Sequence, residues 1–299
     1  MPAEPLIKFL PPQEEVFWSV HRILFLLWRR QFGKSFLFGG KALSRMMSMP
    51  NHSAFVLSAS ILMGQENILK EAAVWNILLD HYRKVAEQNG QKLTSNIDGM
   101  GIDDVAEIFE ASKLEAKIWH SRTSFSRTRV VAPNPATARG FSGDIFGDEF
   151  GFWQDFEAVM DAIEPIISRN PQWIMWMATT PPKDDTHPVY DLLDPGQIQF
   201  AANPRGNWFE TENGYPVHRV DAYDGELAGL PMYHPRSGAA VTVAEARAVA
   251  LNKVNFDRNY LLKFTASGGS AIPRHLITAA QAKGAGQTTG LDITDTLAA

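Results

Sequence analysis

The sequence contains no cysteine, no histidine pair at metal-ligand spacing and no long apolar run. Without cysteine there is no disulfide, no thiolate nucleophile and no cysteine-ligated zinc site. The eight histidines are scattered without an H-x-x-x-H spacing, which argues against a zinc site. A membrane span requires roughly 18 consecutive apolar residues, and residues 1–12 lack the layout of a signal peptide. We therefore expect a cytosolic protein with no membrane partner.

An excess of positive charge is also lacking, because the net charge is −5. Proteins that coat nucleic acid usually have an overall basic balance, so this value argues against such a protein. Basic residues nevertheless outnumber acidic ones between Lys113 and Arg129. We interpret this segment either as the solvated face of a hairpin or as a contact with phosphate backbone. In the second case Arg122, Arg127 and Arg129 are the candidate DNA-binding residues.

The segment WRRQFGKS at residues 28–35 follows an apolar run and precedes a predicted helix over residues 36–49. A strand, a tight turn and a helix N-terminus favour phosphate binding, since unpaired N–H groups and the helix dipole face the anion. Gly33 allows close approach, Lys34 can reach phosphate oxygens, and Ser35 can complete a magnesium shell. The segment resembles a Walker A loop, except that Trp28 stands where the pattern has glycine.

Two later strands can supply the partners that such a loop needs. Residues 143–149 predict a strand that ends in Asp148 and Glu149, which is the Walker B arrangement. The first carboxylate can hold magnesium and the second can polarise the attacking water. The apolar strand predicted over residues 173–178 ends in Thr179 and Thr180, where an additional-strand P-loop ATPase places the group that senses the γ-phosphate.

Strands and helices alternate along most of the chain, which favours a parallel sheet flanked by helices. We expect helices at 14–22, 36–49, 64–89 and 153–168, a helix or turn at 102–112, strands at 23–27, 54–60, 143–149 and 173–178, and a hairpin at 114–120 and 128–132. The predicted fold is an α/β P-loop NTPase of the additional-strand (ASCE) type with a small C-terminal lid or linker subdomain. We assign residues 1–200 to the ATPase core, 201–280 to the lid or linker and 281–299 to a flexible tail.

Together these motifs resemble the ATPase motor domain of the large terminase subunit of tailed bacteriophages, which packs DNA into a procapsid. The resemblance rests on the arginine-rich, deviant Walker A at residues 29–35, and on Ala138-Arg139-Gly140 ahead of the acidic strand end. It rests also on the coupling motif Thr179-Thr180-Pro181, and on a later stretch at 257–264 and 272–280 that is similar to the family's link beyond the ATPase core.

The resemblance implies roles for individual residues. The implied ATP-binding residues are Gln13, Arg29, Arg30, Gln31, Phe32, Gly33, Lys34 and Ser35. The implied catalytic residues are Glu149, Arg139 as a finger toward a neighbouring subunit, and Arg30 as the phosphate-facing arginine of the loop. Ser35 and Asp148 would hold Mg²⁺, and Thr179, Thr180 and Pro181 would couple hydrolysis to movement. Gln13 would read the adenine.

The implied activity is ATP hydrolysis that translocates double-stranded DNA, performed by a homo-oligomeric ring. The implied partners are the portal protein and the small terminase subunit, and the implied location is the host cytoplasm at the portal vertex of the procapsid. Full-length large terminases also carry a ribonuclease-H-like nuclease domain, which we expect this chain to lack. Three explanations fit this expectation: the nuclease domain was removed, it lies on another chain, or it was never present.

Two other functions fit parts of the pattern. Another ASCE DNA-dependent ATPase, such as a helicase, would share the loop, but we find no convincing set of downstream helicase arginine motifs. An adaptor that binds DNA or a portal without hydrolysing ATP would need the fold alone. The presence of Lys34, Asp148 and Glu149 together argues against an adaptor.

Overall fold

The structure is a computed structural model that describes residues 5–90 and 108–265. The main sheet comprises β1 (Ile23–Trp28), β2 (Ser53–Ser58), β3 (Phe109–Ala111), β4 (Glu115–Trp119), β5 (Phe125–Val131), β6 (Asp144–Asp148), β7 (Met175–Thr179), β8 (Asn207–Glu210) and β9 (Pro216–Val220). Within the described ranges these form one nine-stranded sheet in the order β3-β4-β5-β2-β6-β7-β1-β9-β8. From β5 to β9 in this order neighbouring strands are parallel, and the pairs toward both edges are antiparallel.

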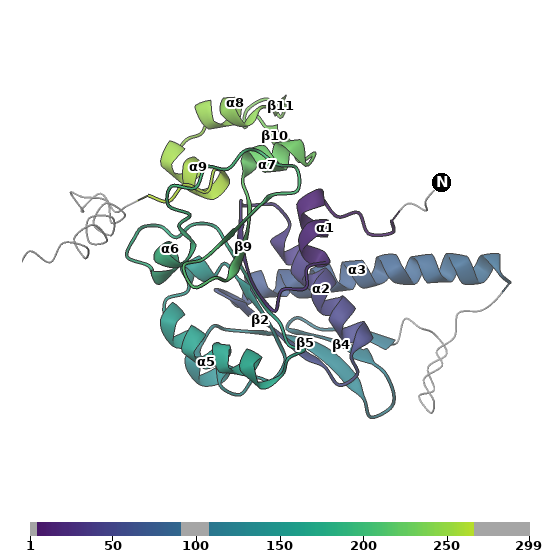
Figure 1. Ribbon diagram of the computed structural model, residues 1–299. Coiled ribbons are helices and arrows are strands. Elements are labelled where there is room, and N and C mark those ends of the chain that lie inside the picture. Colours follow the sequence, from purple (N-terminus) through teal and green to yellow (C-terminus); the bar gives the residue numbers. More distant parts are fainter. Residues whose placement is uncertain (1–4, 91–107, 266–299) are drawn as a thin grey trace, which may run out of the picture.

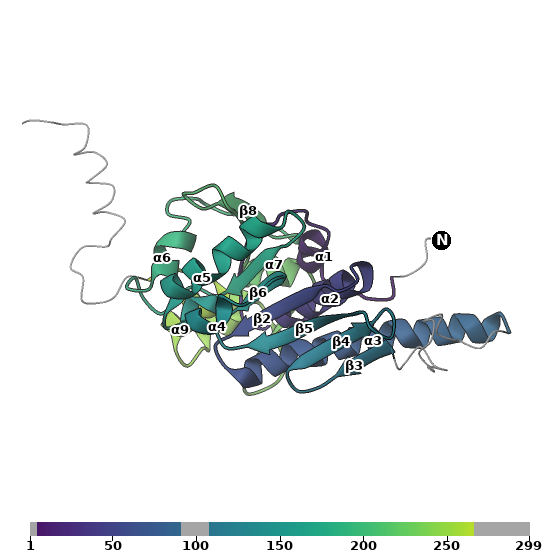
Figure 2. The same ribbon diagram turned by 90° about the horizontal axis from the view of Figure 1, so that it is seen from below.

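Helices cover both faces of the sheet (Figures 1 and 2). One face carries α1 (Pro11–Phe17), α2 (Lys34–Ser48) and α3 (Ile61–Gln88), and the other carries α4 (Pro135–Ala138), α5 (Phe156–Arg169) and α6 (Pro188–Leu193). The C-terminal group contains α7 (Ala222–Leu227), β10 (Met232–Tyr233), β11 (Ala240–Val241), α8 (Val243–Ala248) and α9 (Lys253–Tyr260). Figure 1 shows this group together at one end of the sheet. The predicted α/β fold with a mainly parallel sheet is confirmed.

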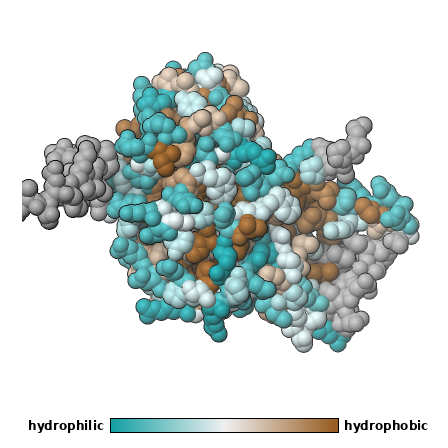
Figure 3. Space-filling view, in the orientation of Figure 1, coloured by the Kyte–Doolittle hydropathy of each residue, from teal (hydrophilic) through white to brown (hydrophobic). Residues whose placement is uncertain are grey.

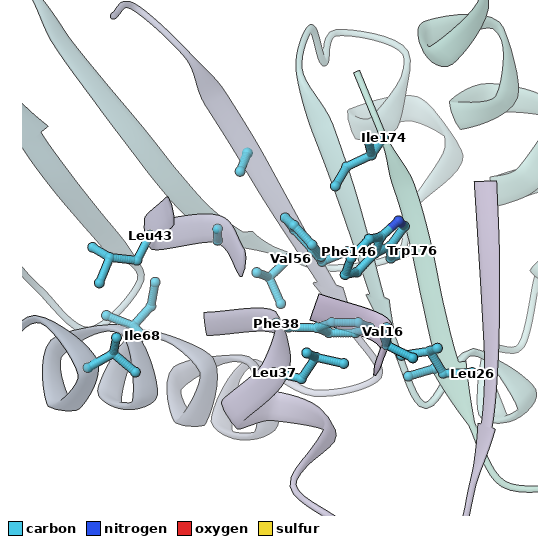
Figure 4. Packing of buried hydrophobic residues seen from close by; sticks show 14 of the residues in the cluster. Val16, Leu26, Leu37, Phe38, Leu43, Val56, Ile68, Phe146, Ile174 and Trp176 are labelled. Carbon is cyan, nitrogen blue, oxygen red and sulfur yellow. The ribbon is translucent and has the colours of Figure 1, made fainter. Parts of the chain in front are cut away.

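The central strands are buried on both faces because helices cover the sheet on both sides. Every residue of β6 and β7 is buried. Figure 4 shows the core under α2, where Phe38 lies among Val16, Leu26 and Phe146. The rings of Phe38 and Phe146 have centroids 5.3 Å apart, so α2 packs directly on β6, the strand that leads into the two acids.

The strand order supports the additional-strand type predicted from the sequence. β7 lies between β1, which leads into the loop, and β6, which ends in Asp148. Because these strands are parallel, their carboxyl ends meet at one edge of the sheet. The loop, the two acids and the threonines after β7 are therefore at the same edge.

Two short elements differ from the sequence prediction. The helix expected at 14–22 is α1, which begins earlier, with Pro11 in its first turn, and ends at Phe17. Residues 109–111, expected as a helix or turn, form β3, because they pair antiparallel with β4. The remainder of that segment up to residue 107 lies outside the described residues.

The sheet extends beyond the predicted boundary near residue 200. Strand β9 pairs in parallel with β1, and β8 pairs antiparallel with β9. Residues 207–210 and 216–220 therefore belong to the same sheet as the loop-bearing strand, and the boundary does not coincide with the edge of the sheet. Residues 266–280 of the predicted lid or linker, including the stretch 272–280, and the predicted tail at 281–299 lie outside the described residues.

None of the helices in the described part of the chain is both long and apolar enough to cross a membrane. An apolar groove of about 680 Å³ lies between the segment before α1, α2 and α3 and is lined by residues that include Phe9, Phe17, Trp18, Met47 and Leu78. Figure 3 shows hydrophobic surface where the N-terminal segment lies against α3. None of the predicted site residues lines this groove.

Candidate nucleotide-binding site

The loop between β1 and α2 is a tight turn at the carboxyl edge of the sheet. Gln31 and Gly33 both have backbone in the left-handed region, with φ of 59° and 78°. A Cβ atom on Gly33 would lie 2.5 Å from the Gln13 side chain, so glycine is required there by conformation and by space. Helix α2 begins at Lys34, which directs its first N–H groups toward the edge where an anion can bind.

Trp28 occupies the position at which the Walker A pattern has glycine. It is the last residue of β1, and its buried indole packs edge-on against Phe32 with ring centroids 5.3 Å apart. Its Nε1–H donates to Nδ1 of His218 at 3.0 Å. The side chain therefore fills the core beneath the loop, and the turn begins one residue later.

Lys34 lies between the loop and the acidic strand end. Its buried Nζ is 3.0 Å from Oε1 of Glu149 and donates to the Trp28 carbonyl at 3.4 Å. The other carboxylate oxygen of Glu149, Oε2, is buried and has no hydrogen-bond partner among the described residues. Lys34 and Glu149 thus form an ion pair at the carboxyl edge of the sheet, and one carboxylate oxygen has no partner among the described residues.

Asp148 is the last residue of β6 and is buried beside the first turn of α2. The Ser35 hydroxyl donates to its Oδ2 at 3.4 Å. Burial and the neighbouring Glu149 raise the pKa of Asp148 to about 6, against the opposing effects of Lys34, Asn67 and Ser35. A carboxylate that is costly to ionise in this position favours a cation beside it.

Glu149 stands in a strained turn. Its φ of 52° places it in the left-handed region, and a short 3₁₀ helix, η2 (Phe150–Phe152), follows directly. The Trp153 indole N–H donates to the Asp148 carbonyl at 3.2 Å and closes this turn. The conformation directs Glu149 back toward Lys34 instead of along the strand.

The threonines after β7 contact the same turn. The Gly151 N–H donates to Thr179 Oγ1 at 3.1 Å, and that hydroxyl donates to the Thr180 carbonyl at 2.8 Å. Oγ1 of Thr180 is buried without a partner among the described residues, and Pro181 is also buried. The exit of β7 is thus tied to the turn that holds Glu149.

Gln13 is buried under the loop. Its Nε2 donates to the carbonyls of Phe32 and Gly33, both at 3.2 Å, and its Oε1 accepts from the Leu10 N–H at 2.9 Å. Both ends of the amide are therefore bonded to the chain. The structure gives Gln13 a position that holds the loop, and its role in reading adenine stays a prediction.

The two loop arginines lie in different surroundings. Arg29 is buried, lies over the Phe32 ring at 5.6 Å and reaches the Leu230 carbonyl at 3.5 Å. Burial lowers the pKa of its guanidinium. Arg30 is exposed, and its backbone N–H donates to the Asn259 carbonyl at 3.0 Å. Arg29 therefore connects the loop to the C-terminal group, whereas the Arg30 side chain is free to reach a ligand.

Arg139 is exposed at the C-terminal end of α4, where its backbone N–H donates to the Pro135 carbonyl at 3.4 Å. Its guanidinium forms no ion pair with any described residue. The side chain is therefore open to a neighbouring molecule.

The predicted DNA-binding arginines lie around β5, and of the three only Arg122 is exposed. Arg127 lies 3.5 Å from Glu115, and Arg129 stacks over the Phe55 ring at 4.9 Å. Burial lowers the pKa of Arg129. Phe55 belongs to the core on the α5 side, so Arg129 is on the opposite face of the sheet from the packing of α2. These contacts fit the interpretation as a hairpin face and leave Arg122 as the side chain most open to phosphate.

The strand that ends in Asp148 is less apolar than a central strand usually is, because it begins with Asp144. That buried carboxylate accepts hydrogen bonds from Arg45 at 2.7 Å, from the His52 ring at 2.8 Å and from the Ile174 N–H at 2.9 Å. Because all of these groups lie near the amino ends of the strands, Asp144 organises the sheet and takes no part in the site.

The residues at the carboxyl edge fit a magnesium ion carried in by a nucleotide. Mg²⁺ takes oxygen ligands and is usually held by one or two protein groups together with phosphate oxygens. Ser35 and Asp148 supply such oxygens, and Glu149 Oε2 and Thr180 Oγ1 are buried without partners in the described part of the chain. Within residues 5–90 and 108–265, no group of three or more histidine and acidic side chains could hold a metal by itself.

Solved structures of phage packaging proteins resemble this architecture. The ATPase domain of the Thermus phage P74-26 large terminase is 15% identical, with a TM-score of 0.55 over 85% of this chain and 93% of that chain. The HK97 bacteriophage large terminase is 14% identical, with a TM-score of 0.51 over 93% of this chain and 54% of that chain. A large terminase from a thermophilic bacteriophage, in complex with ADP, is 11% identical, with a TM-score of 0.50 over 86% of this chain and 54% of that chain.

The chain has the fold of a large terminase ATPase domain. The fold implied by the sequence resemblance is therefore confirmed, and at these identities the likeness extends to the fold alone. The chain matches no family model, and no curated protein matches it in sequence. The roles of individual residues in this terminase fold rest on the geometry described above.

Sequence reasoning missed two polar residues next to Asp148. Ser58 ends β2 directly opposite Asp148, and Asn67 lies on α3 with its side chain buried. Ser58 could have been found, because it ends the strand at the edge where the other site residues gather. Nothing in the local pattern around Asn67 distinguishes it from a solvent-exposed asparagine on a helix.

Proposed function

We propose that this protein is an ATPase that hydrolyses ATP to move double-stranded viral DNA into a procapsid, as the motor part of a large terminase. The supporting observation is the convergence of Lys34, Ser35, Asp148 and Glu149 at the carboxyl edge of a sheet with the additional-strand order. A lysine, a hydroxyl and two carboxylates next to a helix N-terminus are the groups that phosphoryl transfer to water requires.

In this proposal each group has a separate task. When ATP binds, Lys34 leaves its ion pair with Glu149 and binds the β- and γ-phosphate oxygens. The released Glu149 carboxylate orients the attacking water and accepts its proton. Arg30 and the N–H groups of the loop bind the phosphates. Ser35 and Asp148 hold Mg²⁺, which neutralises charge on the phosphates when it is bound.

Movement and assembly complete the proposal. Thr179, Thr180 and Pro181 transmit the state of the site, which is supported by the bond from Gly151 to Thr179 at 3.1 Å. Arg139 serves the ATP of a neighbouring subunit in a homo-oligomeric ring. The partners are DNA, the portal protein and the small terminase subunit, and the place of action is the portal vertex in the host cytoplasm.

Phosphate release from ATP and Mg²⁺, measured with and without linear duplex DNA, tests the function. We expect turnover that DNA increases, no strand separation, and loss of turnover in Lys34→Ala. Lys84→Ala, which changes an exposed lysine far along α3, is the matched control. Unwinding of a forked duplex would favour a helicase, and nucleotide-independent DNA binding without phosphate release would favour an adaptor.

A further inference from the structure

Two buried side chains beside the candidate site carry polar atoms without a hydrogen-bond partner among the described residues. Asn67 is 0% exposed and Ser58 is 1% exposed. Neither polar atom of the Asn67 amide, nor the Ser58 hydroxyl, forms a hydrogen bond with another described residue. Leaving a buried polar group without a hydrogen-bond partner destabilises the fold. Such groups are therefore expected where a ligand or an ordered water completes them.

Both side chains lie beside Asp148. Ser58 and Asp148 are direct partners in the register of β2 and β6, so their side chains point to the same face of the sheet. The Asn67 amide lies close enough to lower the pKa of Asp148, although it forms no hydrogen bond of normal geometry with it. The Ser35 hydroxyl reaches the same carboxylate from α2 at 3.4 Å. Four polar side chains from four elements thus converge.

Close packing fixes the start of α3 in this position. Gly64 lies against Val130 of β5, where a Cβ atom would clash with the Val130 side chain. A Cβ on Gly39 of α2 would lie 2.9 Å from the Glu71 backbone nitrogen and 3.2 Å from the Asn67 carbonyl. Because the two glycines allow α3 to approach both the sheet and α2, Asn67 is held on a rigid element.

We propose that Asn67 and Ser58 hold the hydration shell of the magnesium ion that accompanies ATP, and act as positioning residues for it. The inference rests on the proposed function. Mg²⁺ gives up its waters reluctantly and keeps several of them in protein sites. Those waters need acceptors beyond the direct ligands Ser35 and Asp148. The Asn67 carbonyl and the Ser58 hydroxyl can accept from them, and the Asn67 NH₂ group can orient the Asp148 carboxylate.

A purely structural role for Asn67 and a ligand-holding role predict opposite effects of Asn67→Leu on the stability of the ligand-free protein. If the amide stabilised the fold through its own contacts, Asn67→Leu would lower the melting temperature of the ligand-free protein. If the amide serves a ligand, removing its unpaired polar atoms at similar volume keeps or raises that temperature. Asn76→Leu, on an exposed position of the same helix, is the matched control.

The test measures binding of a fluorescent ADP analogue with Mg²⁺ and with EDTA, together with ligand-free melting temperatures. We expect Asn67→Leu to bind the nucleotide with wild-type affinity in EDTA. Mg²⁺ should raise the nucleotide affinity of this variant about 10–100-fold less than it raises that of the wild type. Ser58→Ala should show a smaller loss of the same kind, and provides the measurement if Asn67→Leu does not fold. Asn76→Leu should match the wild type.

The inference is overturned if Asn67→Leu keeps the full magnesium effect, or loses affinity equally in EDTA and in Mg²⁺. A wild-type protein that binds the nucleotide and responds to Mg²⁺ leaves the proposed function intact in either case. A wild-type protein that binds no nucleotide overturns the proposed function, and the inference with it.

Discussion

The Nζ of Lys34 and the Oε1 of Glu149 lie 3.0 Å apart, so the residue assigned to the phosphates and the residue assigned to the water form an ion pair with each other. Both side chains are largely buried, which makes the pair less screened than one on the surface. Any anion that binds at the loop must compete with Glu149 for the lysine. Nucleotide binding and release of the carboxylate are therefore coupled in our proposal.

Glu149→Gln should separate binding from turnover. The amide cannot accept the proton of the attacking water, so we expect turnover to fall by about 10²–10⁴-fold. Loss of the competing negative charge should keep or increase ATP affinity, whereas Lys34→Ala should lose turnover and weaken binding. Phosphate release and equilibrium binding of an ATP analogue measure the two effects. Glu157→Gln, at an exposed position of α5, is the control, and near-normal turnover in Glu149→Gln would reject this assignment.

Arg139 should act on the ATP of a neighbouring subunit. An arginine supplied in trans contributes on the order of 10³–10⁵ in rate for P-loop enzymes, so specific activity should rise with protein concentration. Arg139→Ala and Lys34→Ala should each be nearly inactive, but their mixture should recover part of the activity. A Lys34→Ala subunit still offers Arg139 to a partner that binds ATP. If subunits associate and no activity returns, Arg139 acts within its own chain or only supports α4.

DNA binding should be weak, sensitive to salt and indifferent to base sequence, because a translocase contacts the backbone without choosing a register. Charge reversal of Arg122 together with Arg127 and Arg129 should weaken it at low salt. Since Arg122 is the exposed member of the three, we expect Arg122→Glu to account for most of the loss. Fluorescence anisotropy with duplex DNA measures this, with Lys183→Glu as the control. Unchanged affinity for duplex DNA at low salt would mean that the hairpin does not contact DNA.

The buried carboxyl group of Glu71 should make stability depend on pH. Burial raises its pKa from 4.5 to about 8, against a smaller effect of the Thr128 hydroxyl. The folded state therefore binds the proton more tightly than the unfolded state. The contribution of protonated Glu71 to the free energy of unfolding is full below pH 4.5, declines as the pH rises and is lost near pH 8. Glu71→Gln keeps the shape without the charge, so its stability should change less than that of the wild type between about pH 5 and 8.

Urea unfolding at several pH values measures this difference. Glu66→Gln, which changes an exposed carboxyl group earlier on α3, should follow the wild type. Parallel pH profiles for Glu71→Gln and the wild type would mean that Glu71 ionises at an ordinary pKa.

The sequence was sufficient for the parts of the site that local patterns encode. Lys34 and Ser35 follow a recognisable turn, and Asp148 and Glu149 end a recognisable strand, so their meeting at one edge follows from parallel pairing alone. Asn67 could not be found in this way, because only the packing of α3 against α2 and the sheet turns it inward. The bonds of Gln13 to the loop likewise depend on tertiary contacts.

The limits of the sheet were harder to predict for the same reason. Strand β9 has the buried pattern of a central strand, but no local feature says that its partner is β1. The change in composition near residue 200 therefore suggested a boundary, whereas the pairing of β9 with β1 continues the sheet beyond it.

The neighbours of β1 also affect the order in which the chain can fold. β1, at residues 23–28, pairs with β7 at 175–179 and with β9 at 216–220, so both partners are made long after it. Contacts of such large sequence separation form slowly. During synthesis, β1 has no β9 strand to pair with until residue 220 has emerged from the ribosome. Until then the apolar residues of β1 are exposed to aggregation. A chain that ended at residue 200 would leave the β9-facing edge of β1 unpaired.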